Sequence, residues 1–160
     1  MFRQLEASDF DDLYRMYSDP SMREFFPEGT LTAEETRSEL DWFASIDPKV
    51  NPLGLWAAIH KSDGEFVGRC GLLSWKIDGA EEIEIAYMID KPFWRRGLGS
   101  EAACGLVKHG FAVTNAERLI ALTDPAHDAS IRTAKSAGLS YWKDIVLDGV
   151  ASAVYKIDRV

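Results

Sequence analysis

The chain has 160 residues, 46% of them hydrophobic and 28% charged, which fits a single domain over residues 1–160 with a substantial core. Its 18 basic and 26 acidic residues give a formal net charge of −8, which disfavours nucleic acid or an anionic membrane as a partner. The two cysteines are isolated, no histidines have metal-binding spacing, and no stretch is long and apolar, so we expect a cytoplasmic protein without a metal site or membrane span.

Hydrophobic periodicity and turn residues predict the element order β-α-α-β-β-β-α-β-α-β-β. Ser8 is the expected cap of the first helix, and Thr32 with Glu35 forms a capping box for the second. Gly138 is expected to end the last helix, and Asp148-Gly149 predicts a tight hairpin between the final strands. The other predicted strands cover residues 2–6, 55–60, 65–75, 82–89 and 118–123. This order predicts a mixed sheet with helices on both faces.

The strand over residues 82–89 has the clearest alternation in the chain. One face carries the apolar side chains Ile83, Ile85, Tyr87 and Ile89. The other face carries Glu82, Glu84, Ala86 and Met88. This strand stands immediately before the most informative loop of the sequence.

That loop is a glycine turn, Arg95-Arg96-Gly97-Leu98-Gly99-Ser100, which leads into an amphipathic helix. Glycines at a helix start let the backbone approach an anion, and the first helical N–H groups have no partners of their own. With Lys91 nearby, these residues predict a cradle for a pyrophosphate. The alternative interpretation is an ordinary helix start whose arginines lie in solvent.

Two other phosphate-binding motifs fit less well. A P-loop requires Gly-Lys-Ser/Thr, which is absent. Gly97, Gly99 and Ala102 match the dinucleotide pattern G-x-G-x-x-A. However, Pro92, Phe93 and Trp94 separate the turn from its strand, whereas a dinucleotide fold needs the turn to follow the strand directly. A nicotinamide-binding module is therefore disfavoured.

Two motifs at this point resemble the GNAT superfamily of N-acetyltransferases. Glu84 to Ile89, the Pro-aromatic-Trp loop and Arg96 to Ala102 are similar to its acetyl-CoA motif. Trp94-Arg95-Arg96-Gly97 and the downstream Asp128-Ala129-Ser130-Ile131-Arg132 resemble the branch of ribosomal-protein N-terminal acetyltransferases. The resemblance covers nearly the whole chain, although the amino-terminal third carries no specific motif.

The resemblance implies an α/β fold, with a mostly antiparallel, twisted sheet of about seven strands and about four helices on its two faces. It also implies acetyl-CoA as co-substrate, without a metal. The cofactor-binding residues that it implies are the backbone of Arg95, Arg96, Gly97, Leu98, Gly99 and Ser100 for the pyrophosphate, Tyr87, Met88 and Ile89 for the pantetheine arm, and His127 in place of the usual Asn.

The same resemblance implies direct attack of an amine on the thioester. Glu84 is then the candidate general base, with Glu82 as the weaker alternative. Many relatives protonate the leaving thiolate with a Tyr that is replaced here by Ala134, so Ser130 is the candidate acid. The alternative interpretations are that Glu84 lines a solvated strand face, and that Ser130 and His127 only belong to a helix start.

The expected acceptor is a protein N-terminus or an amine-bearing small molecule, bound by a monomer or a homodimer. We expect its pocket between the first two helices and the final hairpin. Its candidate walls are the aromatic residues Phe25, Phe26, Trp42, Trp75 and Trp142, for each of which a place in the core is the alternative interpretation. A second function class remains open, a non-catalytic acyl-CoA-binding sensor or pseudoenzyme, because of the departures at Ala134 and His127.

Overall fold

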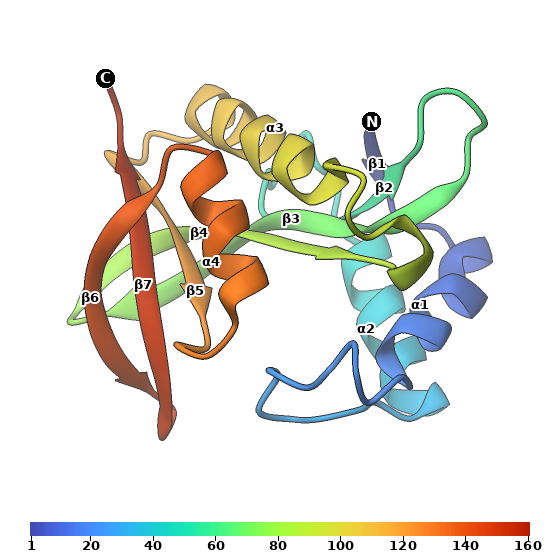
Figure 1. The fold of residues 1–160 in the computed structure, drawn as a ribbon. Coiled ribbons are helices and arrows are strands. Elements are labelled where there is room, and N and C mark those ends of the chain that lie inside the picture. Colours follow the sequence, from blue (N-terminus) through green and yellow to red (C-terminus); the bar gives the residue numbers. More distant parts are fainter.

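The computed structural model describes residues 1–160 and contains one seven-stranded sheet with the strand order β1-β2-β3-β4-β5-β7-β6 (Figure 1). Only β4 and β5 pair in parallel, and every other neighbouring pair is antiparallel. The predicted fold, a mixed and mostly antiparallel sheet, is therefore confirmed. The strands are β1 (Phe2–Gln4), β2 (Gly54–Ile59), β3 (Phe66–Ile77), β4 (Ala80–Ile89), β5 (Arg118–Thr123), β6 (Ser140–Leu147) and β7 (Val150–Asp158).

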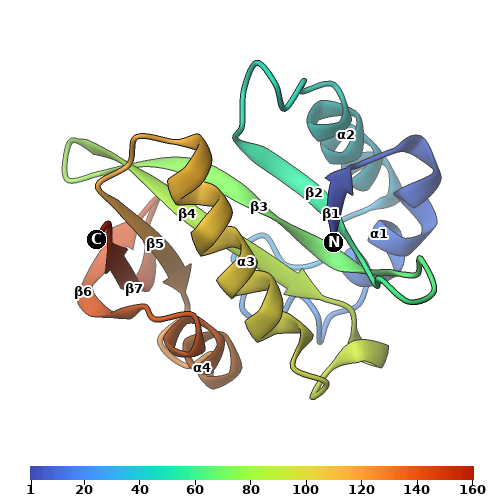
Figure 2. The same ribbon diagram turned by 90° about the horizontal axis from the view of Figure 1, so that it is seen from above.

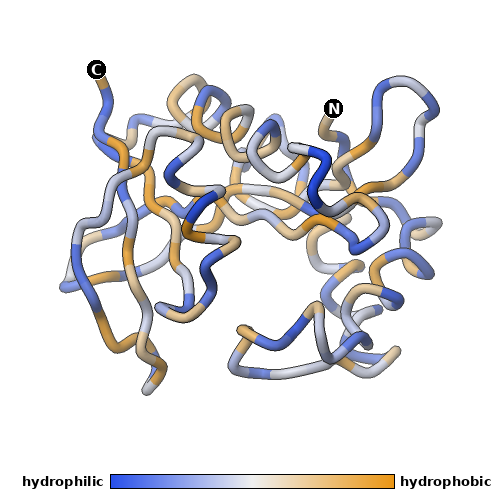
Figure 3. The backbone as a smooth tube through the Cα atoms, in the orientation of Figure 1, coloured by the Kyte–Doolittle hydropathy of each residue, from blue (hydrophilic) through white to orange (hydrophobic).

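Four α-helices cover the two faces of the sheet, α1 and α2 on one and α3 and α4 on the other (Figures 1 and 2). They are α1 (Phe10–Tyr17), α2 (Ala33–Ala44), α3 (Leu98–Val113) and α4 (Asp128–Ser136). The central strands carry apolar colour in Figure 3, and the tip of the β2–β3 loop is hydrophilic. None of these helices combines the length and the apolarity that a bilayer crossing needs.

The first helix begins differently from the prediction. Residues Ala7–Asp9 form a short 3-10 helix, and its capping box joins Glu6 to Asp9. Ser8 therefore does not cap α1, and its hydroxyl instead lies 3.5 Å from the Glu6 carboxylate. Asp9 is buried, and this burial is compensated because both of its oxygens accept hydrogen bonds of 2.8 Å from the guanidinium of Arg3. The capping box of α2 at Thr32 is confirmed.

Two tight hairpins shape the far end of the sheet. The predicted turn at Asp148-Gly149 is confirmed, with φ of 50° and 81°. An equivalent turn at Asp78-Gly79, with φ of 51° and 85°, joins β3 to β4. The same Asp-Gly signal could have identified it, and β3 accordingly runs two residues beyond the predicted end, to Ile77.

The two faces of the sheet have different cores. Beneath α3 and α4, one continuous apolar cluster includes Cys70, Ile85 and Leu106. The opposite face has two separate clusters, one under α1 and α2 that includes Met88, and one around Ile120 beside β6 and β7. Glu84 lies on this second face, because its register partner on β5 is Ile120. Glu84 thus places a buried carboxylate between these two apolar clusters.

The sheet opens between β4 and β5. Their pairing covers only Ile83 with Leu119 and Glu84 with Ile120, although β4 continues to Ile89 alongside β3. The ribbons of β4 and β5 diverge beyond this point in Figure 2. One edge of β4 is therefore left without a neighbouring strand, directly before the glycine turn.

Candidate active site

The glycine turn follows the open end of β4 through a short 3-10 helix, Lys91–Phe93. Arg95 and Gly97 both have left-handed backbone conformations, with φ of 60° and 78°. The indole of Trp94 donates a hydrogen bond of 2.6 Å to the carbonyl of Ile89, which anchors the loop to the end of β4. These constraints aim the backbone of the turn at the start of α3.

The turn presents a row of unused hydrogen-bond donors. The first intrahelical hydrogen bond of α3 runs from the N–H of Glu101 to the carbonyl of Gly97, at 3.0 Å. No turn, cap or side chain accepts a hydrogen bond from the backbone N–H groups of residues 95–100, and Gly97 offers no side-chain cap. Six consecutive free donors at the positive end of a helix dipole fit a diphosphate group.

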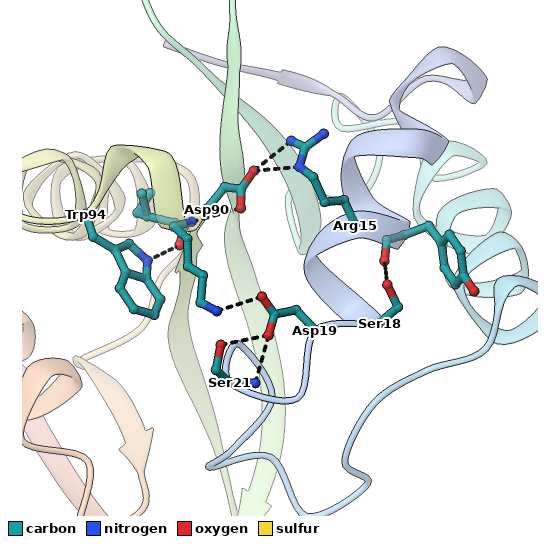
Figure 4. Close-up of polar contacts among 9 residues, drawn as sticks. Arg15, Ser18, Asp19, Ser21, Asp90 and Trp94 are labelled. Carbon is teal, nitrogen blue, oxygen red and sulfur yellow. Dashed lines mark hydrogen bonds and ion pairs between the residues drawn. The ribbon is translucent and has the colours of Figure 1, made fainter.

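Space and charge around these donors fit the same ligand. A Cβ at Gly99 would meet nothing closer than the Thr133 hydroxyl at 3.7 Å, so the approach to the helix start is open. Arg95 and Arg96 are exposed and form no ion pair with this chain. Lys91 is different from the prediction in that its ammonium group is paired with Asp19 at 2.8 Å (Figure 4).

A second ion pair fastens this region to the amino-terminal helices. The carboxylate of Asp90 is buried and accepts hydrogen bonds of 2.6 and 3.1 Å from Arg15 on α1 (Figure 4). The other oxygen of Asp90 accepts from the N–H of Lys91, at 2.8 Å, and so caps the 3-10 helix. Arg15 and Asp90 thus connect α1 with the start of the glycine turn.

The open edge of β4 offers backbone groups from alternate residues only. The N–H of Asp90 donates to Val67 on β3, and hydrogen-bonded positions alternate along an antiparallel pair. The backbone of Met88 therefore points to β3, whereas those of Tyr87 and Ile89 point to the open side. The carbonyl of Ile89 already accepts from Trp94. Of the three predicted residues, Tyr87 and Ile89 keep free N–H groups, and Met88 does not.

Glu84 is a buried carboxylate at the point where β4 and β5 separate. The indole of Trp75 donates a hydrogen bond of 2.6 Å to it. Burial raises the pKa of Glu84 to about 7, against the opposing effects of the Trp75 hydrogen bond, the charge of Arg69 and the Leu122 backbone. A carboxyl group with this pKa exchanges protons readily near neutral pH.

Glu82, the weaker candidate, is placed differently. Its carboxylate is buried, and both oxygens lie 3.1 Å from Nε of Arg118. Glu82 is therefore engaged by Arg118, whereas Glu84 has no ion-pair partner. The ion pair with Arg118 distinguishes Glu82 from Glu84, whereas the alternation of the strand only places both on the same face.

Ser130 lies in the first turn of α4 and touches Tyr87. The phenol of Tyr87 donates a hydrogen bond of 3.0 Å to the carbonyl of Ser130, and its oxygen is 3.4 Å from the Ser130 hydroxyl. Burial raises the pKa of Tyr87 to about 12, so the phenol stays protonated. The sequence analysis missed this contact, although the strand alternation already placed Tyr87 on the face that α4 covers. Ala134, at the position of the usual Tyr, is fully buried.

His127 precedes α4 and stacks on Phe25, with ring centroids 4.2 Å apart and an interplanar angle of 14°. Phe25 belongs to the segment between α1 and α2, so this contact spans the two halves of the site. Burial lowers the pKa of His127, which favours the neutral ring. Among the other predicted wall residues Trp75 contacts Glu84, whereas Trp42 is 66% exposed on α2 and is not part of the core.

Comparisons with known proteins agree with this architecture. The family model for the acetyltransferase (GNAT) domain matches residues 1–140. The protein YkkB of Bacillus subtilis is 32% identical over 155 residues, which cover 96% of this chain and 89% of YkkB. A GNAT-family acetyltransferase from Bacillus anthracis superposes with a TM-score of 0.82 at 23% identity, covering 98% of this chain and 93% of the other. The aminoglycoside acetyltransferase AAC(6')-Ib, solved with coenzyme A and kanamycin, gives a TM-score of 0.76 at 15% identity, with 99% and 94% covered.

Proposed function

This chain belongs to the GNAT acetyltransferase family, and we propose that it transfers an acetyl group from acetyl-CoA to a primary amine. The observation that carries the proposal is the combination of six free N–H groups at residues 95–100 with the open edge of β4 beside Glu84. The free N–H groups suit a diphosphate, and Glu84, at the point where β4 and β5 separate, suits proton transfer at a reacting amine. No other part of the chain offers both.

Acetyl-CoA would supply the activated acetyl group as a thioester, and this chain would bind and orient it. The N–H groups of residues 95–100 would hold the pyrophosphate, with Arg95 and Arg96 balancing its charge. The free N–H groups of Tyr87 and Ile89 would pair with the extended pantetheine arm, as an added strand does. One of these N–H groups would also polarise the thioester carbonyl. His127 would donate a hydrogen bond to the arm from the opposite side.

Glu84 acts as the general base in this proposal. An amine is nucleophilic only without its extra proton, so a group beside it must accept that proton as the new amide bond forms. Glu84 can do so at neutral pH because burial has raised its pKa to about 7. The indole of Trp75 holds the carboxylate in place at 2.6 Å. Direct transfer of the acetyl group then requires no covalent enzyme intermediate.

The departing thiolate takes a proton to become the free thiol of coenzyme A. Ser130 is our candidate donor, with its hydroxyl oxygen 3.4 Å from the phenol oxygen of Tyr87, and solvent would return a proton to the serine after the transfer. The thiolate needs little assistance, because a free thiol has a pKa of about 8.5 and its thiolate is therefore a good leaving group near neutral pH. Solvent remains the competing donor.

The test mixes the protein with acetyl-CoA and a panel of amines and follows release of the free thiol. The panel includes polyamines, aminoglycosides, amino acids and peptides with free N-termini, the last because of the resemblance to the ribosomal-protein branch. We expect release with at least one class, together with a rise in melting temperature on adding coenzyme A. Thermal stabilisation without any acetyl transfer would instead support the sensor interpretation. The absence of both thermal stabilisation and acetyl transfer would contradict the proposal.

A further inference from the structure

Two buried arginines lie on the same face of the sheet as Glu84. Arg69 on β3 is 7% exposed, and Arg23, between α1 and α2, is 5% exposed. Their guanidinium carbons lie 5.8 and 4.1 Å from the centre of the Phe26 ring, so the two cations flank one aromatic side chain. Burial, followed by repulsion from Arg69, lowers the pKa of Arg23.

Arg69 has no carboxylate partner of its own. Its Nε–H donates a hydrogen bond of 3.0 Å to the Tyr17 hydroxyl, which itself donates to Glu39 at 2.5 Å. The two Nη atoms of Arg69 donate no hydrogen bond, yet no polar side-chain atom that is sealed from solvent lacks a partner. Both Nη atoms therefore reach an accessible space, although the side chain as a whole is buried.

The buried charge of Arg23 has only slightly more compensation than that of Arg69. Its Nε–H donates to the carbonyl of Gly29 at 2.7 Å, and its nearest carboxylate is Glu28 at 3.5 Å. Glu28 is 66% exposed, so this pair is weak. Buried charges in proteins are normally paired with a counter-ion. The charge of Glu39 favours both guanidinium groups, although Glu39 forms no direct ion pair with either of them. The two Nη atoms of Arg69 are therefore left open to a carboxylate on a ligand.

The position of Arg69 relative to Glu84 identifies that ligand as the acceptor. Glu84 faces Leu73 across the β3–β4 pair, and Arg69 is four residues from Leu73 on the same face, a backbone spacing of about 14 Å at ~3.4 Å per residue. Between them this face carries only Gly71 and Ala86, which have almost no side chain. The glycine turn and its free N–H groups lead into α3, which covers the opposite face.

We propose that the acceptor is a small amine that also carries a carboxylate, held by the free Nη atoms of Arg69 with Arg23 behind it, while its amine lies at Glu84. This inference rests on the proposed acetyl transfer and names its substrate class. The planar fork of a guanidinium binds both oxygens of a carboxylate and so fixes the orientation of the molecule that bears it. Amino acids and related aminocarboxylates have this chemistry, whereas polyamines do not.

The test compares matched acceptors, amino acids against their carboxamides, with aminophosphonates as a second anionic arm. For the wild type we expect kcat/KM at least tenfold higher for the acid than for the amide. Arg69→Gln should raise KM for the acid about ten- to a hundredfold and leave the amide within about threefold. Arg69→Lys should recover part of the affinity. Arg37→Gln on α2, an arginine outside this site, is the control and should change neither. Equal use of acid and amide by the wild type, or an equal loss for both in Arg69→Gln, would overturn the inference.

A binding measurement keeps this inference separate from the proposed function. Calorimetry with coenzyme A present should show that the acid binds the wild type and binds Arg69→Gln at least tenfold more weakly, provided that both proteins melt cooperatively. If Arg69→Gln does not fold, Arg23→Gln takes its place. Arginine-dependent binding without acetyl transfer would contradict the proposed reaction and support the carboxylate site. Acetyl transfer without preference for a carboxylate would support the proposed reaction and contradict the carboxylate site.

Discussion

At the scale of single residues, Glu84 differs from its neighbours through burial and through its partner. Glu82 and Glu84 alternate on one strand face, and the sequence could place both there. It could not show that Arg118 on β5 neutralises Glu82, or that Trp75 on β3 orients Glu84, because both partners are distant in the chain. The family resemblance already favoured Glu84 over Glu82, and these tertiary contacts support that choice.

The raised pKa of Glu84 predicts how stability changes with pH. A carboxyl group with a folded pKa of about 7 and an ordinary value of 4.5 favours the fold when protonated, so its contribution is complete below about pH 4.5 and is lost as pH rises through about 7. Glu84→Gln cannot ionise and avoids this loss. We expect its free energy of unfolding, relative to the wild type, to rise by up to about 3 kcal/mol from pH 5 to pH 8 in urea titrations. The exposed Glu81→Gln serves as control, and a constant difference across this range would contradict the assignment.

Ser130 and Tyr87 can be separated because they meet at two different atoms of Ser130. Tyr87→Phe removes the donor to the Ser130 carbonyl and should cost about 1 kcal/mol of stability. Ser130→Ala keeps that carbonyl and removes only the hydroxyl, so we expect a smaller loss of stability but a fall in kcat of up to roughly tenfold. Melting temperature and single-turnover rates measure the two effects. If Ser130→Ala changes only the melting temperature, solvent protonates the thiolate.

At the scale of elements, local signals located most strands, helices and turns. Asp148-Gly149 and the Thr32 capping box were readable because their geometry depends on neighbours within four residues. Ser8 was misassigned because Asp9 pairs with Arg3 of β1, which draws the preceding residues into a separate 3-10 turn. Register with β3 likewise decides which residues of β4 have free N–H groups, and no local pattern contains that information.

Substitutions at the two glycines of the turn should have different effects. Gly97 has a left-handed φ of 78°, so Gly97→Ala should cost about 1 kcal/mol of stability. A side chain at Gly99 meets only ordinary contacts at 3.7 Å or more, so Gly99→Val should fold nearly as well as the wild type. It should nevertheless lose at least about tenfold in coenzyme A affinity, because its methyl groups occupy the approach to the free N–H groups. Wild-type affinity in Gly99→Val would exclude this turn as the binding site.

The link between α1 and the glycine turn gives a further prediction. Asp90→Asn keeps a cap for the 3-10 helix but loses the charge that binds Arg15, and we expect a loss of about 1–2 kcal/mol, discounted because Arg15 is 53% exposed. Coenzyme A affinity should fall with it, since the turn is less firmly held. Asp19→Asn, which breaks the exposed pair with Lys91, is the matched control and should change little. Denaturant unfolding and calorimetry would measure both, and equal effects of the two variants would contradict the role of Asp90.

At the scale of the whole molecule, one sheet separates two different environments. The α3 and α4 face is one continuous apolar core, and the free donors lie at the start of α3. The α1 and α2 face is interrupted by Glu84, Arg69 and the segment that carries Arg23 and Phe26. The stack of Phe25 on His127 joins the two halves. In the proposed carboxylate site, Arg23 and Phe26 of the amino-terminal third would act together with Arg69 of β3 in recognising the acceptor.

The resemblance to a known family was readable from residues 84–102 and 128–132 because close backbone approach to a phosphate restricts those residues strongly. The buried arginines were not identified from the sequence. A single arginine in an apolar strand has no local signature, and its meaning depends on the absence of a carboxylate partner, which only the fold reveals.

The most direct measurement of the central claim is the pH dependence of acetyl transfer in the wild type and in Glu84→Gln, with a saturating acceptor and product detected by mass spectrometry. The account predicts a wild-type kcat that rises with pH through an inflection near 7, where Glu84 loses its proton. It predicts that Glu84→Gln lacks this inflection, turns over about 10²–10⁴-fold more slowly and still binds coenzyme A with nearly wild-type affinity. A variant that keeps wild-type turnover and the same pH profile would contradict the account.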